Sequence, residues 1–176
     1  MNPANWITVG RIALVPVFLV LAYMRTDAGA IAALVVFVIA SASDRLDGHL
    51  ARRHQMVSRL GEFLDPSADK LLIGAALWVL VDLHGFPLWA ALVIAFREAA
   101  VQVLRTRIVA RGGTLPSSVT GKVKTVLQVT MVCWWLFPAE PNPSHWILLI
   151  AVVAMTIWSG FEYFMRAMRT TEKVSA

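Results

Sequence analysis

The sequence predicts an all-α integral membrane protein with six transmembrane helices, folded as a single domain over residues 1–176. Three observations predict this fold class. The chain is 58% hydrophobic and only 15% charged, and its mean hydropathy of +0.66 lies above the range of soluble domains. Six apolar segments alternate with short connectors that are rich in turn-forming residues. Basic residues gather in alternate connectors, as they do in multi-pass membrane proteins.

The six apolar segments account for most of the chain. We expect them at residues 5–25, 30–50, 65–83, 87–110, 118–138 and 145–167. Their uncharged runs are only 11 to 16 residues long, whereas a spanning helix needs about 20 residues. The charged residues beside these runs must therefore lie at membrane depth, where they are tolerated if they face a water-filled cavity. The sequence thus predicts a polar chamber that opens to the cytoplasm.

The basic residues predict the orientation of the chain. They lie in the connectors near 52–61 and 105–124 and in the C-terminal tail, and Arg25 is the sole basic residue of an outer loop. By the positive-inside rule, both termini are cytoplasmic. The first residues resemble neither a cleaved secretory signal nor a transit peptide, which favours a bacterial inner membrane. The net charge of +5 suits anionic lipid, and nucleic acid is a poor partner because the charge is confined to loops.

Four aspartates interrupt the junction between the second and third apolar segments. Asp44 and Asp47 are three residues apart, and Asp65 and Asp69 are four apart, so each pair falls on one face of a helix. Two antiparallel helices could point both pairs at one space, and Pro66 suits the first turn or a kink of the later helix. Converging carboxylates need a counter-charge. All-oxygen donors favour Mg²⁺ or Mn²⁺, and two such ions commonly serve phosphoryl displacement.

Small and basic residues accompany these aspartates. Gly48, Ala51 and Gly61 would let a ligand approach the backbone closely, and Arg52 could pair with a phosphate oxygen. The alternative interpretation is that the small residues pack helices and the acids pair with nearby arginines. Four acids at this spacing favour the ligand site over that alternative.

The run DRLDGHLAR, followed after eight residues by GEFLDPSAD, resembles the signature D-x2-D-G-x2-A-R-x8-G-x3-D-x3-D of the CDP-alcohol phosphatidyltransferases. This resemblance implies a six-helix membrane fold, usually a homodimer, with a two-metal site at the cytoplasmic surface. It implies that Asp44, Asp47 and Asp65 hold metal, and that Asp69 is the general base and also touches metal. The residues that would bind the CDP-linked donor are Asn5, Thr8, Gly48, Ala51, Arg52 and Gly61.

Three further stretches resemble the members of this family that use glycerol 3-phosphate. They are the opening NPANWITVGR with its N-x2-T-x2-R pattern, FREAAVQVLR at 96–105 and TGKVKTVLQ at 120–128. The opening departs from the pattern in having Ala4 where a proline often precedes the asparagine. The resemblance implies that a phosphatidyl group passes from CDP-diacylglycerol to sn-glycerol 3-phosphate, giving phosphatidylglycerol phosphate and CMP.

A set of basic residues could bind the phosphate of such an acceptor. Its members lie near the cytoplasmic ends of the fourth and fifth apolar segments: Arg97, Arg105, Lys122 and Lys124. Guanidinium and ammonium groups suit a phosphate monoester, although snorkelling to lipid headgroups is an alternative. Arg97 is followed by Glu98, so it could instead form a structural ion pair.

The sequence is also compatible with other acceptors. Inositol phosphate is also anionic, and phosphatidylglycerol would be the acceptor in a cardiolipin synthase. A cation transporter is a more distant possibility, because it would be expected to carry ionisable residues across the midplane and an internal repeat. Neither feature is visible in the sequence.

Overall fold

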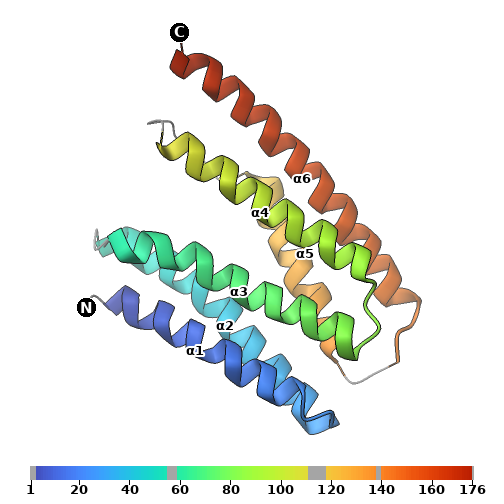
Figure 1. The fold of residues 1–176 in the computed structure, drawn as a ribbon. Helices are drawn as coiled ribbons and strands as arrows, with labels where there is room; N and C mark the ends of the chain where they lie inside the picture. The colour runs from blue at the N-terminus through green and yellow to red at the C-terminus, as the bar shows by residue number, and fades with distance from the viewer. Residues whose placement is uncertain (1–2, 55–58, 111–117, 138–139, 176) are drawn as a thin grey trace. The chain divides into compact units, whose positions relative to one another are not determined.

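The computed structural model describes residues 3–54, 59–110, 118–137 and 140–175, with side chains described at 10–43, 70–110, 118–137 and 140–168. These residues form six α-helices and no strand (Figure 1). The helices are α1 (Pro3–Ala22), α2 (Asp27–His54), α3 (Arg59–Leu83), α4 (Leu88–Ala110), α5 (Val119–Leu136) and α6 (Pro143–Ser175). The predicted all-α class is confirmed for this part of the chain. The helices divide between two compact units, residues 1–86 with 132–140 and residues 87–131 with 141–176.

The helices around the aspartates are longer than the apolar segments predicted. Helix α2 continues to His54 and α3 begins at Arg59, so most of the connector expected at 52–61 is helical. Of the two interpretations of Pro66, the first-turn position is wrong, because Pro66 lies well inside α3, where it removes one hydrogen bond of the helix. A local kink at Pro66 stays a prediction. The apolar pattern does not predict the helical turns at the end of α2 and the start of α3. Arg, Glu, Leu and Ala favour helix formation even where a helix has no apolar face.

Helix α6 is the strongest candidate for a membrane span. Among the described residues, its stretch Pro143–Met168 alone is long and apolar enough to cross a bilayer, with a mean hydropathy of 1.8. Shorter apolar stretches occur at Gly10–Ala22 and Asp27–Ser43. The six helices are thus confirmed, whereas six membrane crossings stay a prediction.

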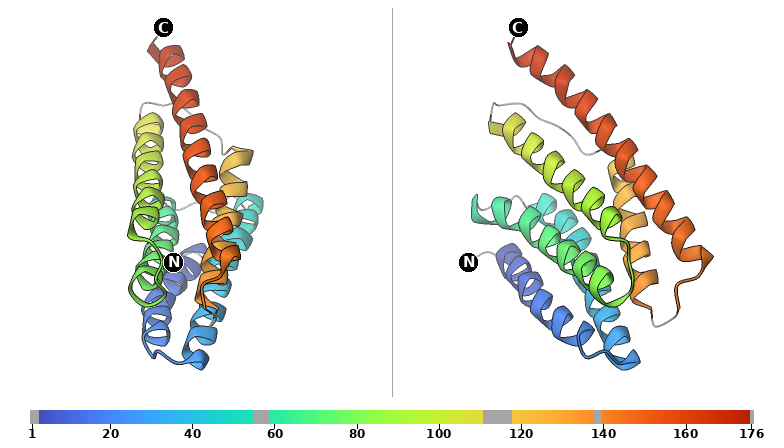
Figure 2. Two further views of the ribbon diagram at one scale, coloured as in Figure 1. Left: turned by 90° about the vertical axis from the view of Figure 1, so that its right-hand side faces the viewer. Right: turned by 45° about the vertical axis from the view of Figure 1, so that its right-hand side comes forward.

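The first unit is built on α1, α2 and α3, which pack side by side (Figures 1 and 2). Phe18 of α1 meets Phe37 of α2 with ring centroids 6.1 Å apart, and both rings are fully buried. Leu72 and Leu80 of α3 are also fully buried. Each fully buried side chain of this size contributes about 1.5–3 kcal/mol to stability, so these contacts hold the backbone that carries the aspartates.

The turn between α1 and α2 is fixed by a close approach and a polar contact. A Cβ on Gly29 would lie 2.7 Å from the carbonyl oxygen of Leu21, which only glycine avoids. Nearby, the Tyr23 hydroxyl donates to the Asp82 carboxylate at 2.9 Å and accepts from Trp78 Nε1 at 3.0 Å. These contacts tie the turn to the end of α3.

Trp135 anchors the end of α5 within the same unit. Its indole is 2% exposed, and Nε1 donates to the carbonyl oxygen of His84 at 3.0 Å. The ring also meets Phe86 edge to face, with centroids 4.9 Å apart and an angle of 77° between the planes. Such a buried aromatic pair adds to the energy of burial alone.

Replacing Trp135 with alanine should therefore destabilise the protein by about 3–5 kcal/mol, through the cavity and the unsatisfied carbonyl. The measurement is the thermal unfolding midpoint in detergent. The adjacent Trp134 is 48% exposed, so Trp134→Ala is the matched control and should change the midpoint little. Equal shifts for the two variants would contradict the anchoring role.

The second unit contains α4, α6 and most of α5. Helix α4 packs along α6 (Figure 2). Its core includes the buried residues Ile108, Tyr163 and Ala167. Helix α6 begins with a cap, because Asn142 Oδ1 accepts the backbone N–H of Ser144 at 3.0 Å and Pro143 occupies the first helical position. This unit carries the basic residues that the sequence assigns to an anionic acceptor.

Candidate functional site

The backbone places the four aspartates on two helices of the first unit. Asp44 and Asp47 lie in the C-terminal half of α2, and Asp65 and Asp69 lie in the N-terminal half of α3. Since α2 and α3 are consecutive and pack against each other, both pairs lie toward the end of the unit that is opposite the α1–α2 turn. The side chains of all four lie outside the described part of the structure, so their metal-binding role stays a prediction.

The residues assigned to the CDP-linked donor also lie on the helices of this unit. Asn5 and Thr8 belong to α1, the segment 48–52 to α2 and Gly61 to α3. Their side chains lie outside the described residues as well. Among the side chains that the structure does describe, no group of three His, Cys, Asp or Glu lies together. The four aspartates are the candidate donors, and all-oxygen donors on adjacent helices fit Mg²⁺ or Mn²⁺.

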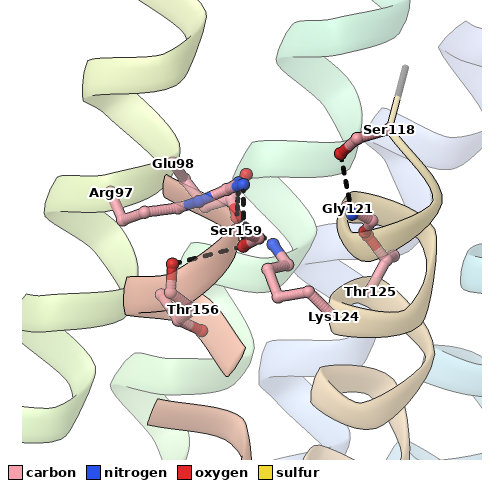
Figure 3. A network of polar contacts seen from close by, with 8 residues as sticks. All are labelled: Arg97, Glu98, Ser118, Gly121, Lys124, Thr125, Thr156 and Ser159. Carbon is pink, nitrogen blue, oxygen red and sulfur yellow. Dashed lines mark hydrogen bonds and ion pairs between the residues drawn. The ribbon is translucent and has the colours of Figure 1, made fainter. Parts of the chain in front are cut away.

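Glu98 is the centre of a polar cluster in the second unit (Figure 3). Its Oε1 lies 3.2 Å from Nη1 of Arg97 and is also in contact with Nζ of Lys124. The Lys124 side chain is only 4% exposed, that of Arg97 14% and that of Glu98 24%. One carboxylate on α4 therefore joins two of the predicted acceptor cations, one from its own helix and one from α5.

Arg97 is held from a third helix as well. Its Nη2 donates to the hydroxyl of Ser159 on α6 at 3.1 Å, and Ser159 in turn donates to the carbonyl oxygen of Thr156 at 3.2 Å. A Cβ on Gly160 would lie 3.3 Å from Cγ of Arg97, so glycine leaves room for the arginine side chain. Nε of Arg97 is buried without a hydrogen-bond partner in the described structure. Arg97 thus occupies a fitted position between α4 and α6.

The start of α5 is fixed by a second carboxylate. Ser118 caps the helix, because its Oγ accepts the backbone N–H of Gly121 at 3.0 Å. The Thr120 hydroxyl donates to Oε2 of Glu162 on α6, and Oε1 of Glu162 forms an ion pair with Arg166 one turn later. The first turns of α5 are therefore held by Glu162 of α6 and by Glu98 of α4.

The other two predicted acceptor cations are exposed. Lys122 lies two residues before Lys124, about 200° away around the helix, and it is exposed where Lys124 is buried. Arg105 is also exposed and lies seven residues after Glu98, on the same face of α4 and roughly 10 Å further along its axis. The structure brings Arg97 and Lys124 together on Glu98, and it leaves Arg105 and Lys122 accessible to a ligand.

Several residues of this cluster escape sequence reasoning. Arg97 and Glu98 are adjacent in the sequence, so their pairing can be expected. Glu98 and Lys124 are 26 positions apart, and the sequence does not indicate that they pair. No sequence motif marks Glu162 or Ser159. The one sequence feature that could have indicated Glu162 is its position directly after the long apolar run of α6, where an ionised group requires a partner.

The CDP-alcohol phosphatidyltransferase family model matches residues 1–158, and the chain belongs to this family. It is 36% identical to the CDP-diacylglycerol–glycerol-3-phosphate 3-phosphatidyltransferase of Bacillus subtilis, over 94% of each chain. It is 37% identical to a probable phosphatidylglycerophosphate synthase of Mycobacterium tuberculosis, over 96% of this chain and 82% of that protein. A third relative, from Pseudomonas fluorescens, has the same name as the B. subtilis protein and is 38% identical over 95% of this chain and 90% of its own.

One solved structure supports the fold. The phosphatidylinositol phosphate synthase of Mycobacterium tuberculosis, crystallised with manganese and citrate, aligns with a TM-score of 0.67 over 96% of this chain and 83% of that one. The sequence identity is 20%, so this likeness supports the fold alone. The family model and the curated relatives confirm the resemblance of the sequence to the CDP-alcohol phosphatidyltransferases.

Proposed function

We propose that the protein transfers a phosphatidyl group from CDP-diacylglycerol to sn-glycerol 3-phosphate, giving phosphatidylglycerol phosphate and CMP. The observation that carries this proposal is the set of relatives named for that reaction, which are 34–38% identical over at least 94% of this chain. The alignments with these relatives cover both the helices that carry the aspartates and the helices that carry the basic residues.

Asp44, Asp47 and Asp65 would hold two divalent cations, together with Asp69, at one end of the first unit. When bound, Mg²⁺ or Mn²⁺ supplies Lewis-acid stabilisation of charge on the donor's diphosphate. The donor set fits this role because all four groups are carboxylates, on two helices that pack together. The phosphatidylinositol phosphate synthase that shares this fold was crystallised with manganese.

Asp69 would act as general base. The 1-hydroxyl oxygen of glycerol 3-phosphate attacks the phosphorus that carries the diacylglycerol group, and its proton passes to the Asp69 carboxylate. The new P–O bond forms as the bond to the bridging oxygen breaks, and CMP leaves with that electron pair. Gly48, Ala51 and Arg52 would hold the donor's diphosphate, with Asn5, Thr8 and Gly61 completing the donor site.

The basic residues of the second unit would bind the acceptor's phosphate. Arg105 and Lys122 are exposed cations, while beside Glu98 Lys124 is buried and Arg97 is partly buried. These four cations and Glu98 together carry a net charge of +3, which suits a phosphate dianion. Charge-assisted hydrogen bonds to phosphate are stronger than those between neutral groups.

A panel of acceptors tests the proposed reaction. The purified protein is supplied with CDP-diacylglycerol, Mg²⁺ and one acceptor at a time: glycerol 3-phosphate, inositol phosphate or phosphatidylglycerol. We expect rapid CMP release with glycerol 3-phosphate and little with the other two. Faster release with inositol phosphate would reassign the acceptor within the family.

We further infer a multi-pass protein of the bacterial inner membrane, with six spans, cytoplasmic termini and the site at the cytoplasmic face. The helices contain 18 to 33 residues, or about 27–50 Å at 1.5 Å per residue, which is close to or above the thickness of the hydrocarbon core. The basic residues at alternate ends of these helices support the orientation. Assembly as a homodimer is proposed from the family resemblance.

Cysteine labelling tests this topology. In a Cys133→Ser background, single cysteines at Thr26, Gly85 and Asn142 should react with an impermeant maleimide added outside intact cells. Cysteines at Met56 and Gly113 should react only after the membrane is opened. Labelling of the Met56 position from outside would contradict six spans with a cytoplasmic N-terminus.

A further inference from the structure

Glu98 has a role in the second unit that its position beside Arg97 in the sequence does not suggest. A simple ion pair would join one acid to one base. Here a single carboxylate oxygen contacts both Nη1 of Arg97 and Nζ of Lys124, and these bases come from different helices. The acid therefore bridges α4 and α5 at the point where the predicted acceptor cations gather.

The burial of Lys124 makes this bridge important. An ammonium group that is only 4% exposed must keep a partner, because an unpaired buried charge is strongly destabilising. Without Glu98, Lys124 would lose this carboxylate, which holds its ammonium group at the junction of α4 and α5. Its charge would then be held less firmly in the position that it has in this structure.

Glu98 also fixes the direction of the exposed lysine. Thr120 joins the first turn of α5 to Glu162, and Lys124 joins the second turn to Glu98. Lys122 lies between these two attachment points. A helix that is held at both points presents Lys122 in one orientation, and Glu98 supplies one of the two points.

We propose that Glu98 is a positioning residue for the acceptor: it does not touch the acceptor, and it holds Arg97 and Lys124 in the arrangement that receives the acceptor's phosphate. The inference rests on the proposed function and adds a residue to it. An acid at the centre of a cationic site also separates two positive groups that would otherwise repel each other. Replacement of Glu98 is therefore expected to weaken the binding of the acceptor and to leave the binding of the donor unchanged.

The first test compares Glu98→Gln with the matched control Glu140→Gln. Glu140 is exposed in the loop between α5 and α6, so its replacement should leave the kinetics unchanged. Glu98→Gln should raise KM for glycerol 3-phosphate by about 10–100-fold, with KM for CDP-diacylglycerol within about two-fold of wild type. Glu98→Asp keeps the charge and should recover part of the loss. Equal changes in both KM values would show a general structural effect and would overturn the proposal.

A double-mutant cycle tests whether Glu98 acts through Lys124. If it does, Glu98→Gln combined with Lys124→Gln should raise the acceptor KM no more than about two-fold beyond the worse single variant, because the effects are coupled. Fold-changes that multiply would overturn the proposal. If Glu98→Gln does not fold, Glu98→Asp takes its place in the cycle with the same criterion.

The failure of this inference is distinct from the failure of the proposed function. A wild-type protein that releases no CMP with glycerol 3-phosphate would overturn the function itself. An active wild-type protein whose acceptor KM is unchanged in Glu98→Gln would overturn only the role of Glu98.

Discussion

Replacement of Asp69 by asparagine is expected to lower kcat by roughly 10²–10⁴-fold, the usual contribution of a positioned general base. Asparagine has almost the same size, but it cannot accept the proton of the attacking hydroxyl. Asp44→Asn, Asp47→Asn and Asp65→Asn should also remove most activity, since each takes a charged oxygen from the predicted metal site. The measurement is CMP release at saturating CDP-diacylglycerol and glycerol 3-phosphate.

Asp82→Asn is the matched control for these variants. Asp82 lies on the same helix as Asp69, but it is exposed and accepts a hydrogen bond from Tyr23 at the other end of α3. Its replacement should leave kcat close to wild type. Asp69→Asn with wild-type kcat would contradict the assignment of the base.

Removal of divalent cations should abolish turnover in the same assay. Mg²⁺ or Mn²⁺ added after EDTA should restore it, because the four aspartates would otherwise repel each other and the diphosphate. Undiminished activity in EDTA would contradict a metal-dependent site at these positions.

Replacement of Arg105 or Lys122 by alanine is expected to raise KM for glycerol 3-phosphate by roughly 10–150-fold, the loss of one charge-assisted hydrogen bond to phosphate. The contact is remote from the reacting phosphorus, so kcat should change much less. KM for CDP-diacylglycerol should also stay near the wild-type value. Arg52→Ala should instead raise KM for CDP-diacylglycerol and leave KM for glycerol 3-phosphate near wild type.

Arg107→Ala provides the control on the same helix. Arg107 is exposed like Arg105, but it lies two residues further and about 200° around α4. It is interpreted as a residue of the positive cytoplasmic face and should have a wild-type acceptor KM. If Arg105→Ala and Lys122→Ala both kept the wild-type value as well, the acceptor site would have to lie elsewhere.

The number of helices follows from the sequence because it depends on local patterning, whereas the acidic metal site stays a prediction. The apolar runs give the helices, and the spacing of Asp44, Asp47, Asp65 and Asp69 places each pair on one helical face. The sequence does not predict the end of α2 or the start of α3 correctly, because the helical turns there are polar and Pro66 lies inside α3. Apolar periodicity carries no information about a helical turn that has no apolar face.

Contacts between distant residues are the part that sequence reasoning could not reach. The charge pattern assigns Lys124 to an anionic acceptor, but the burial of Lys124 against Glu98 depends on the rotation of α5 relative to α4. The bond from Trp135 to the carbonyl oxygen of His84 likewise joins residues 51 positions apart. Such contacts follow from packing in three dimensions, and a charge pattern along one helix cannot specify its partner on another.

The identity of the lipid product tests the central claim most directly. The purified protein, reconstituted in vesicles that contain CDP-diacylglycerol, is supplied with Mg²⁺ and glycerol 3-phosphate, and lipids and nucleotides are quantified by mass spectrometry. We predict phosphatidylglycerol phosphate and CMP in equal amounts, with neither formed when glycerol 3-phosphate is omitted. CMP released without glycerol 3-phosphate, or a lipid product with a different headgroup, would contradict the proposed reaction.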